Sequence, residues 1–145
     1  MKASVFVLVV GSMTLAASFA TAGAQQAAPA SASVGVYSAE QATRGQAAYV
    51  FSCKDCHGPA LAGGDLAPPL AGKDFVARWR DFSVGDLFDK VSTSMPPNAP
   101  GSLKLSQYAD ALAYILNVNK YPPGAAELPA EATPLQSVRM GPPPQ

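Results

Sequence analysis

The residues of this 145-residue chain that are best suited to chemistry lie between positions 53 and 57, in the order Cys, Lys, Asp, Cys, His. In a helix, positions 53, 56 and 57 share one face because residues three and four apart are neighbours. Two thiols placed in this way can bond to the two vinyl groups of a haem, and C-x-x-C-H is the attachment signature of a c-type haem. The motif predicts one haem c attached through Cys53 and Cys56, with His57 as an axial ligand of the iron.

Three rival interpretations of the motif account for fewer of its residues. A thioredoxin-like dithiol belongs in a βαβ unit, and no β-branched run flanks positions 53–57. A structural zinc site needs four Cys or His ligands, whereas the chain has two Cys and one His. A plain disulfide between Cys53 and Cys56 would leave His57 without a role. Haem attachment is therefore the favoured interpretation.

Met95 is the predicted second axial ligand. A haem iron held by His on one side takes Met on the other in electron-transfer proteins. Met1 and Met13 lie in the N-terminal targeting segment, and Met140 lies in a Pro-rich tail that we expect to lack a scaffold. Met95 stands at a helix end fixed by two prolines, which can hold its sulfur in place. A methionine that merely fills a core is the alternative.

The segment between residues 58 and 72 contains seven Gly and Pro residues and is predicted to be a loop. An iron-bound His normally donates its other ring N–H to a fixed acceptor. A backbone carbonyl within residues 67–70, which include Pro68, is the best candidate, and Leu70 is expected to cover the ring. A loop that only turns the chain is the alternative.

Trp79 is the single tryptophan and lies between Arg78 and Arg80 on a predicted short helix over residues 73–80. Arginines donate paired hydrogen bonds to carboxylates, so this group is a candidate for covering the haem propionates. A core tryptophan flanked by two solvated arginines accounts for the same residues equally well.

The first residues have the pattern of a secretory signal peptide. Lys2 precedes an apolar stretch that runs to Ala20, and small residues over 20–24 offer a cleavage site. A membrane anchor is the alternative, but the apolar stretch is shorter than the roughly 20 residues that span a bilayer. We predict a cleaved signal peptide over residues 1–24, periplasmic localisation and no stable membrane insertion.

The remaining chain predicts one all-α domain over residues 38–124. Helical periodicity predicts helices over residues 39–53, 84–93 and 107–119, the first of them opened by a capping box of Ser38 and Gln41. Gly45 and Tyr49 are expected to meet Ala111 and Tyr114 where the first and last helices cross. Residues 25–37 are predicted to be a flexible leader, and residues 125–145 an extended, largely unfolded Pro-rich tail.

The charge of the chain excludes one class of partner. Removal of residues 1–24 leaves nine basic and ten acidic residues, and the Lys and Arg residues are scattered. Nucleic-acid binding proteins concentrate positive charge on one surface. No nucleic acid is therefore expected as a partner, and electrostatic steering of any partner should be weak.

Residues 38 to about 124 resemble class I monohaem cytochromes c. The residues that carry the resemblance are Gly45, Tyr49, Cys53, Cys56, His57, Pro68, Leu70, Met95 and Tyr114. The resemblance implies an all-α fold of three main helices and short helices around one haem. It also implies that the carbonyl of Pro68 accepts a hydrogen bond from His57 and that Met95 is an axial ligand.

The run from Met95 to Leu103 and the segments 114–116 and 119–124 are similar to bacterial cytochromes that accept electrons from periplasmic dehydrogenases. This similarity implies an electron carrier rather than an enzyme, with a dehydrogenase as donor and an oxidase or another cytochrome as acceptor. The lysine ring with which mitochondrial cytochromes dock is not evident. Two alternatives stay open: a haem subunit bound to a dehydrogenase through the leader and tail, and a haem enzyme or gas-binding protein with a displaceable sixth ligand.

Overall fold

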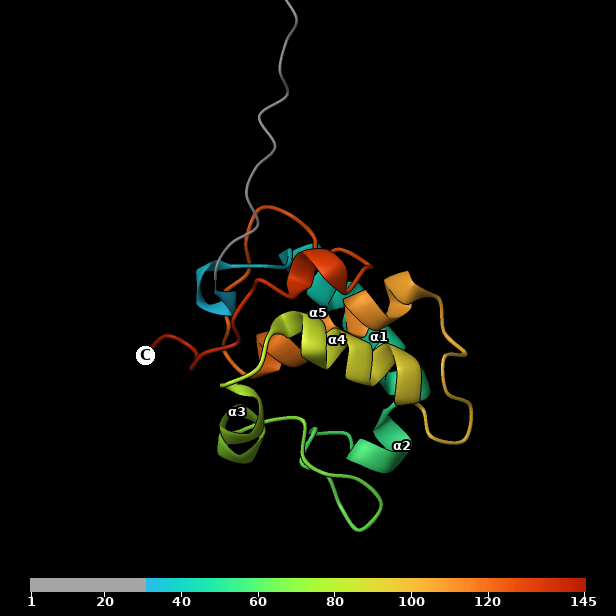
Figure 1. Cartoon of the computed structure of the whole chain (residues 1–145). Coiled ribbons are helices and arrows are strands. Elements are labelled where there is room, and N and C mark those ends of the chain that lie inside the picture. The colour runs from blue at the N-terminus through green and yellow to red at the C-terminus, as the bar shows by residue number, and fades with distance from the viewer. Residues whose placement is uncertain (1–30) are drawn as a thin grey trace, which may run out of the picture.

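The computed structural model describes residues 31–145, and within this range the regular structure is helical, which confirms the all-α prediction (Figure 1). The predicted signal peptide and the first residues of the predicted leader lie outside the described residues. The helices are the 3-10 helices η1 (Ala32–Val34) and η2 (Thr133–Leu135) and the α-helices α1 (Ala39–Ser52), α2 (Lys54–His57), α3 (Lys73–Trp79), α4 (Val84–Ser94) and α5 (Leu105–Val118).

The close crossing of α1 and α5 confirms the role predicted for Gly45. A Cβ atom added at Gly45 would overlap the backbone carbonyl of Asp110 and lie 3.0 Å from the Cβ of Tyr114. One turn further along α1, the ring of Tyr49 lies 5.5 Å from the ring of Tyr114, with the two planes inclined by 51°. The backbones of the two helices can approach this closely because glycine has no side chain.

Helix α1 begins at the predicted cap, but its capping box is only half formed. The hydroxyl of Ser38 accepts a hydrogen bond from the backbone N–H of Gln41 at 3.1 Å, as expected. The side chain of Gln41 does not return to Ser38. It pairs instead with the backbone of Leu128, to which it donates at 3.0 Å and from which it accepts at 2.7 Å. A long-range partner in the tail has therefore replaced the local one.

Helix α4 has a complete capping box. The Ser83 hydroxyl accepts from the backbone N–H of Asp86 at 2.9 Å, and the Asp86 carboxylate accepts from the backbone N–H of Ser83 at 2.8 Å. The hydrogen bonds that the Asp86 carboxylate accepts from Ser83 lower the pKa of Asp86. The helix extends to Ser94, one residue beyond the predicted end, and Met95 follows it directly.

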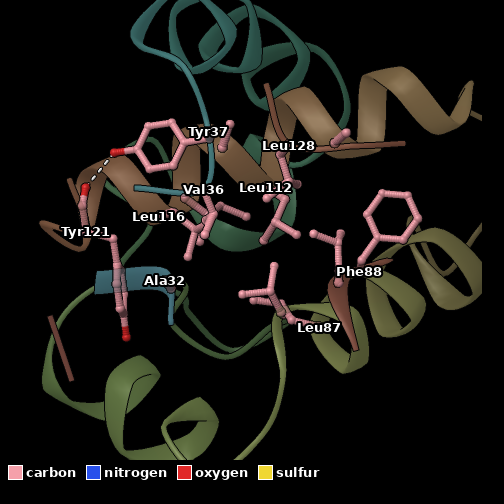
Figure 2. Packing of buried hydrophobic residues seen from close by; sticks show 14 of the residues in the cluster. Ala32, Val36, Tyr37, Leu87, Phe88, Leu112, Leu116, Tyr121 and Leu128 are labelled. Atoms are coloured by element: carbon pink, nitrogen blue, oxygen red, sulfur yellow. Dashed lines mark hydrogen bonds between the residues drawn. The ribbon is translucent and has the colours of Figure 1, made fainter. Parts of the chain in front are cut away.

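The described part of the leader is packed rather than flexible, so that expectation was wrong for residues 31–37. Ala32, Val36 and Tyr37 are buried. Figure 2 shows Val36 beside Leu116 and the hydroxyl of Tyr37 directed at the backbone of Tyr121, to which it donates at 2.6 Å. The burial of so few apolar residues gives no periodic signal, which is why composition alone suggested a flexible segment.

The C-terminal tail is also packed, and the expectation that it is largely unfolded was wrong. Its apolar residues Leu128, Leu135, Val138 and Met140 are each no more than 2% exposed. The prolines between them do not prevent burial. They restrict the unfolded chain and so reduce the entropy that is lost when the segment is ordered. Met140 therefore does have a scaffold, contrary to the expectation from the sequence.

We predict that Gly45→Ala lowers the free energy of unfolding of the haem-loaded protein by about 2 kcal/mol, because α1 and α5 must separate to admit the new methyl group. This loss exceeds the roughly 1 kcal/mol gain in helix propensity. Guanidinium unfolding followed by far-UV circular dichroism measures it. Gly64→Ala is the control, since a Cβ atom at Gly64 meets no atom within 4 Å. Equal stability of the two variants would contradict the crossing.

Candidate haem-binding site

One open cavity brings together residues from five parts of the described chain: the end of α1 with α2, the loop that follows, α3, α4 with the turn after it, and α5. In Figure 1, α2 and α3 lie below α4. All seven residues predicted for the site line this cavity, namely Cys53, Cys56, His57, Pro68, Leu70, Trp79 and Met95.

The two cysteines are held at the junction of α1 and α2. Cys53 follows α1 and is the N-cap of α2, and its carbonyl accepts from the backbone N–H of His57 at 3.0 Å, so the motif forms a single helical turn. Neither cysteine forms a disulfide, and both are partly buried. Burial, and to a smaller extent the neighbouring Cys56, raises the pKa of Cys53 to about 11.

These properties argue against a catalytic dithiol and against a structural zinc site. A catalytic dithiol depends on a thiol whose pKa is lowered, whereas that of Cys53 is raised. Within residues 31–145, no group of three or more His, Cys, Asp and Glu side chains is placed to hold a metal ion. A structural zinc site would need such a group.

The imidazole of His57 is 8% exposed, and its Nδ1 lies 2.8 Å from the backbone oxygen of Pro68. A carbonyl oxygen only accepts hydrogen bonds, so this contact requires the proton to be on Nδ1. The other ring nitrogen, Nε2, is then left with a free lone pair. An imidazole in this tautomer is ready to bind a metal, and the hydrogen bond fixes the plane of its ring.

The loop that carries Pro68 is held by side chains that the sequence did not single out for this role. The hydroxyl of Tyr49 donates to the carbonyl of Gly58 at 2.6 Å. The amide of Asn119, directly after α5, donates to the carbonyl of Leu70 at 2.8 Å and accepts from the backbone N–H of Gly72 at 2.9 Å. Asn119 thus ties the end of α5 to the loop, and nothing in its sequence neighbourhood indicates this long-range contact.

Met95 lines the cavity from the turn that follows α4. The hydroxyl of Tyr108 on α5 donates to the backbone oxygen of Met95 at 2.6 Å, a contact that the sequence likewise did not indicate. The other described methionine, Met140, is fully buried and does not line the cavity. Both methionines are held by the fold, and they differ in that only Met95 lines the cavity.

The structure separates the two arginines beside Trp79. Arg78 and Trp79 both line the cavity, and Leu70 lines it from the loop. The Nε atom of Arg80 instead lies 3.6 Å from a carboxylate oxygen of Asp81 at the surface. The Trp79 ring lies 5.6 Å from that of Phe82 in an edge-on arrangement. Of the two arginines, only Arg78 is placed to meet a group in the cavity.

The shape and lining of the cavity fit a haem. Its empty space is about 940 Å³, including its open mouth, and its lining is mainly apolar. The groups that a haem needs are among its few other residues: two cysteines at one turn of helix, His57 and Met95, together with the polar side chains of Ser52, Arg78, Lys90 and Tyr108. An apolar wall with these few groups is suited to a large, flat, mostly apolar cofactor.

A comparison with protein families agrees with this site. Residues 40–115, slightly more than half of the chain, match the family described as cytochrome C oxidase, cbb3-type, subunit III. The structure is also similar to the crystal structure of the sulfane dehydrogenase SoxCD from Paracoccus pantotrophus, with 25% sequence identity and a TM-score of 0.44. That similarity covers 56% of this chain and 44% of the other. No curated protein sequence matches.

The family match includes the whole attachment motif, Met95 and most of α5. Covalently bound haem c is the cofactor of this family, and Cys53, Cys56 and His57 have the spacing that its attachment needs. The chain therefore belongs to this family of cytochrome c domains, and it is a class I monohaem c-type cytochrome that takes part in electron transfer.

Proposed function

We propose that this protein carries single electrons between a periplasmic dehydrogenase and a downstream acceptor through a haem iron ligated by His57 and Met95. The observation that carries the proposal is that one cavity contains the thiols of the attachment motif, an imidazole with a free Nε2 and the side chain of Met95. The common location of these groups in one cavity supports the proposal.

When haem c is bound, its iron supplies the one-electron change between the ferrous and ferric states. The protein supplies the environment of that change. The carbonyl of Pro68 keeps the proton on Nδ1 of His57, which leaves Nε2 to the iron. The thioether of Met95 favours the ferrous state and raises the reduction potential. Leu70, Trp79 and the apolar side of α5 exclude water from the cofactor.

Two protein ligands favour a carrier over an enzyme. A haem enzyme or a gas-binding protein needs an open or easily displaced position on the iron. With His57 and Met95 both bound, no position remains for a substrate. Rapid binding of carbon monoxide to the ferrous protein would support the alternative of a displaceable sixth ligand.

The alternative of a subunit anchored through its leader and tail loses support. Residues 31–37 and the apolar residues of the tail pack on the domain of their own chain, so they are not free to dock elsewhere. Deletion from Pro122 onward would also remove buried side chains from the core. A loss of co-purification after that deletion would therefore not distinguish docking from misfolding.

The net charge of the chain suggests how it meets its partners, and the predicted signal peptide suggests where it is located. The near-neutral chain should meet its partners through a small apolar contact around the haem edge, which favours transient encounters. Across residues 31–145 no helix has the length and apolarity needed to cross a membrane. Export by the predicted signal peptide over residues 1–24 would deliver the chain to the periplasm.

We predict that Met95→Ala abolishes the sulfur-to-iron absorption band of the ferric protein and lowers its reduction potential, because the thioether that favours ferrous iron is lost. Absorption spectra in the red and a redox titration measure the two effects. Met140→Leu is the matched control, because it replaces a buried methionine that does not line the cavity. A spectrum unchanged by Met95→Ala would refute the ligation.

The carrier role is tested with the protein purified from the periplasmic fraction of its host. We predict a covalent haem, a mass that lacks residues 1–24, and reduction of the haem by a periplasmic dehydrogenase supplied with its substrate. Mass spectrometry and stopped-flow absorbance measure these properties. The proposal fails if the haem-loaded protein keeps its first 24 residues, or if no periplasmic dehydrogenase of the host reduces it.

A further inference from the structure

Residues 125–141 are more than a cover for the core, because their second half packs on the N-terminal half of α4. We call these residues the strap. The backbone N–H of Val84 donates to the carbonyl of Val138 at 2.8 Å, and that of Met140 donates to the carbonyl of Phe82 at 3.0 Å. Helix η2 within the strap packs directly on α4 (Figure 1). The strap therefore binds both the first residue of α4 and the residues Phe82 and Ser83 that precede the helix.

Both ends of the strap are fixed to other parts of the domain. At its beginning, Leu128 is bound by the reciprocal pair of hydrogen bonds with the Gln41 side chain of α1. At its end, the carbonyl of Gly141 accepts from the hydroxyl of Tyr121 at 2.6 Å. The carbonyl of Arg139 accepts from the backbone N–H of Ala32 at 2.9 Å. The strap thus connects α4 to the α1–α5 core.

Gly85 and Gln136 lie at a close approach between α4 and the strap. A Cβ atom at Gly85 would lie 2.7 Å from the backbone nitrogen of Gln136 and 2.9 Å from the carbonyl oxygen of Ala132. The Gln136 side chain accepts from the Ser83 hydroxyl at 3.0 Å and donates to the Asp89 carboxylate at 3.1 Å. The strap approaches the helix this closely because position 85 has no side chain.

The strap and the cavity lie on opposite sides of α4. Gly85 and Asp89 contact the strap, whereas Leu87 and Val91 line the cavity. Residues two apart in an α-helix are separated by about 200° around its axis, so these two pairs face in nearly opposite directions. Met95, which follows α4, also lines the cavity. The helix is therefore clamped between the strap and the haem site.

We propose that the strap is a positioning element of the haem site, which holds α4 against the cofactor and keeps the sulfur of Met95 within reach of the iron. This inference rests on the ligation proposed above. Without the strap, the face of α4 at Gly85 would be bare backbone exposed to water. Segments with few buried contacts open locally at low free energy, so α4 would swing away from the haem more often.

The test uses the ferric, haem-loaded protein and imidazole, which competes for the position of the Met95 sulfur. Gly85→Ala forces the strap away from α4, and Gln136→Ala removes only the side-chain bonds. In Gly85→Ala we expect imidazole to displace the sulfur, and so to remove the sulfur band, about tenfold faster than in the parent protein. This factor corresponds to a free energy of opening of α4 that is about 1.4 kcal/mol smaller. In both variants the sulfur band should disappear on heating before the helical circular dichroism signal does.

Three controls separate positioning from general stability. Gly64→Ala adds a methyl group in open space, and Ser137→Ala alters a strap hydroxyl that bonds only to Pro134 within the strap. Both should match the parent protein. Gly45→Ala weakens the core away from α4, so its sulfur band and helical signal should be lost together. Because Gln136 is exposed, Gln136→Ala keeps the test valid if Gly85→Ala does not fold.

Each outcome decides between the proposals. If both strap variants lose the sulfur band and the helical signal together and react with imidazole at the parent rate, the strap does not position Met95. If Met95→Ala leaves the band intact, the ligation itself is wrong, whatever the strap variants do. Both the Met95 ligation and the positioning role of the strap are supported by one result. The sulfur band is then normal in the parent protein, absent in Met95→Ala, and lost more readily in the two strap variants.

Discussion

The contact between the backbones of α1 and α5 at Gly45 is the constraint on which the haem site depends. Helix α1 ends at the attachment motif, and α5 contributes Tyr108 and the apolar wall of the same cavity. The crossing therefore sets the distance between the point where the haem is tied and the wall against which it lies. Asn119, just after α5, extends this influence to the loop that orients His57.

The sequence was sufficient to predict the parts of the site whose chemistry is local. Cys53, Cys56 and His57 lie within one helical turn, so their spacing alone specifies their geometry. Helices α1 and α4 were predictable because Ser38 and Ser83 cap them and their apolar residues recur with helical period. Helix α5 was predictable from its period, and it begins at Leu105, two residues before the predicted start. The Gly45 crossing could be predicted because a glycine in line with Tyr49 on a helix permits close approach by another helix, and the structure favours this over the alternative of a plain surface glycine.

The features that could not be predicted from the sequence are those that depend on contacts between residues distant in the chain. Asn119 and Tyr108 act through single hydrogen bonds to backbone groups, and such bonds leave no pattern in the sequence. The burial of Leu128, Leu135, Val138 and Met140 was missed because prolines interrupt every period that could indicate it. Composition described the tail correctly as lacking an α-helix, but whether an irregular segment packs is decided by the surface that it meets.

The separation of the strap from the cavity has a consequence for how such a protein can vary. Residues 125–141 reach the haem site only indirectly, through elements such as α4, because none of them lines the cavity. Substitutions in the strap therefore change how firmly α4 is held without changing any surface that a cofactor touches. Exchange of this segment is thus a route by which related chains can keep the same cofactor contacts and differ in their rigidity.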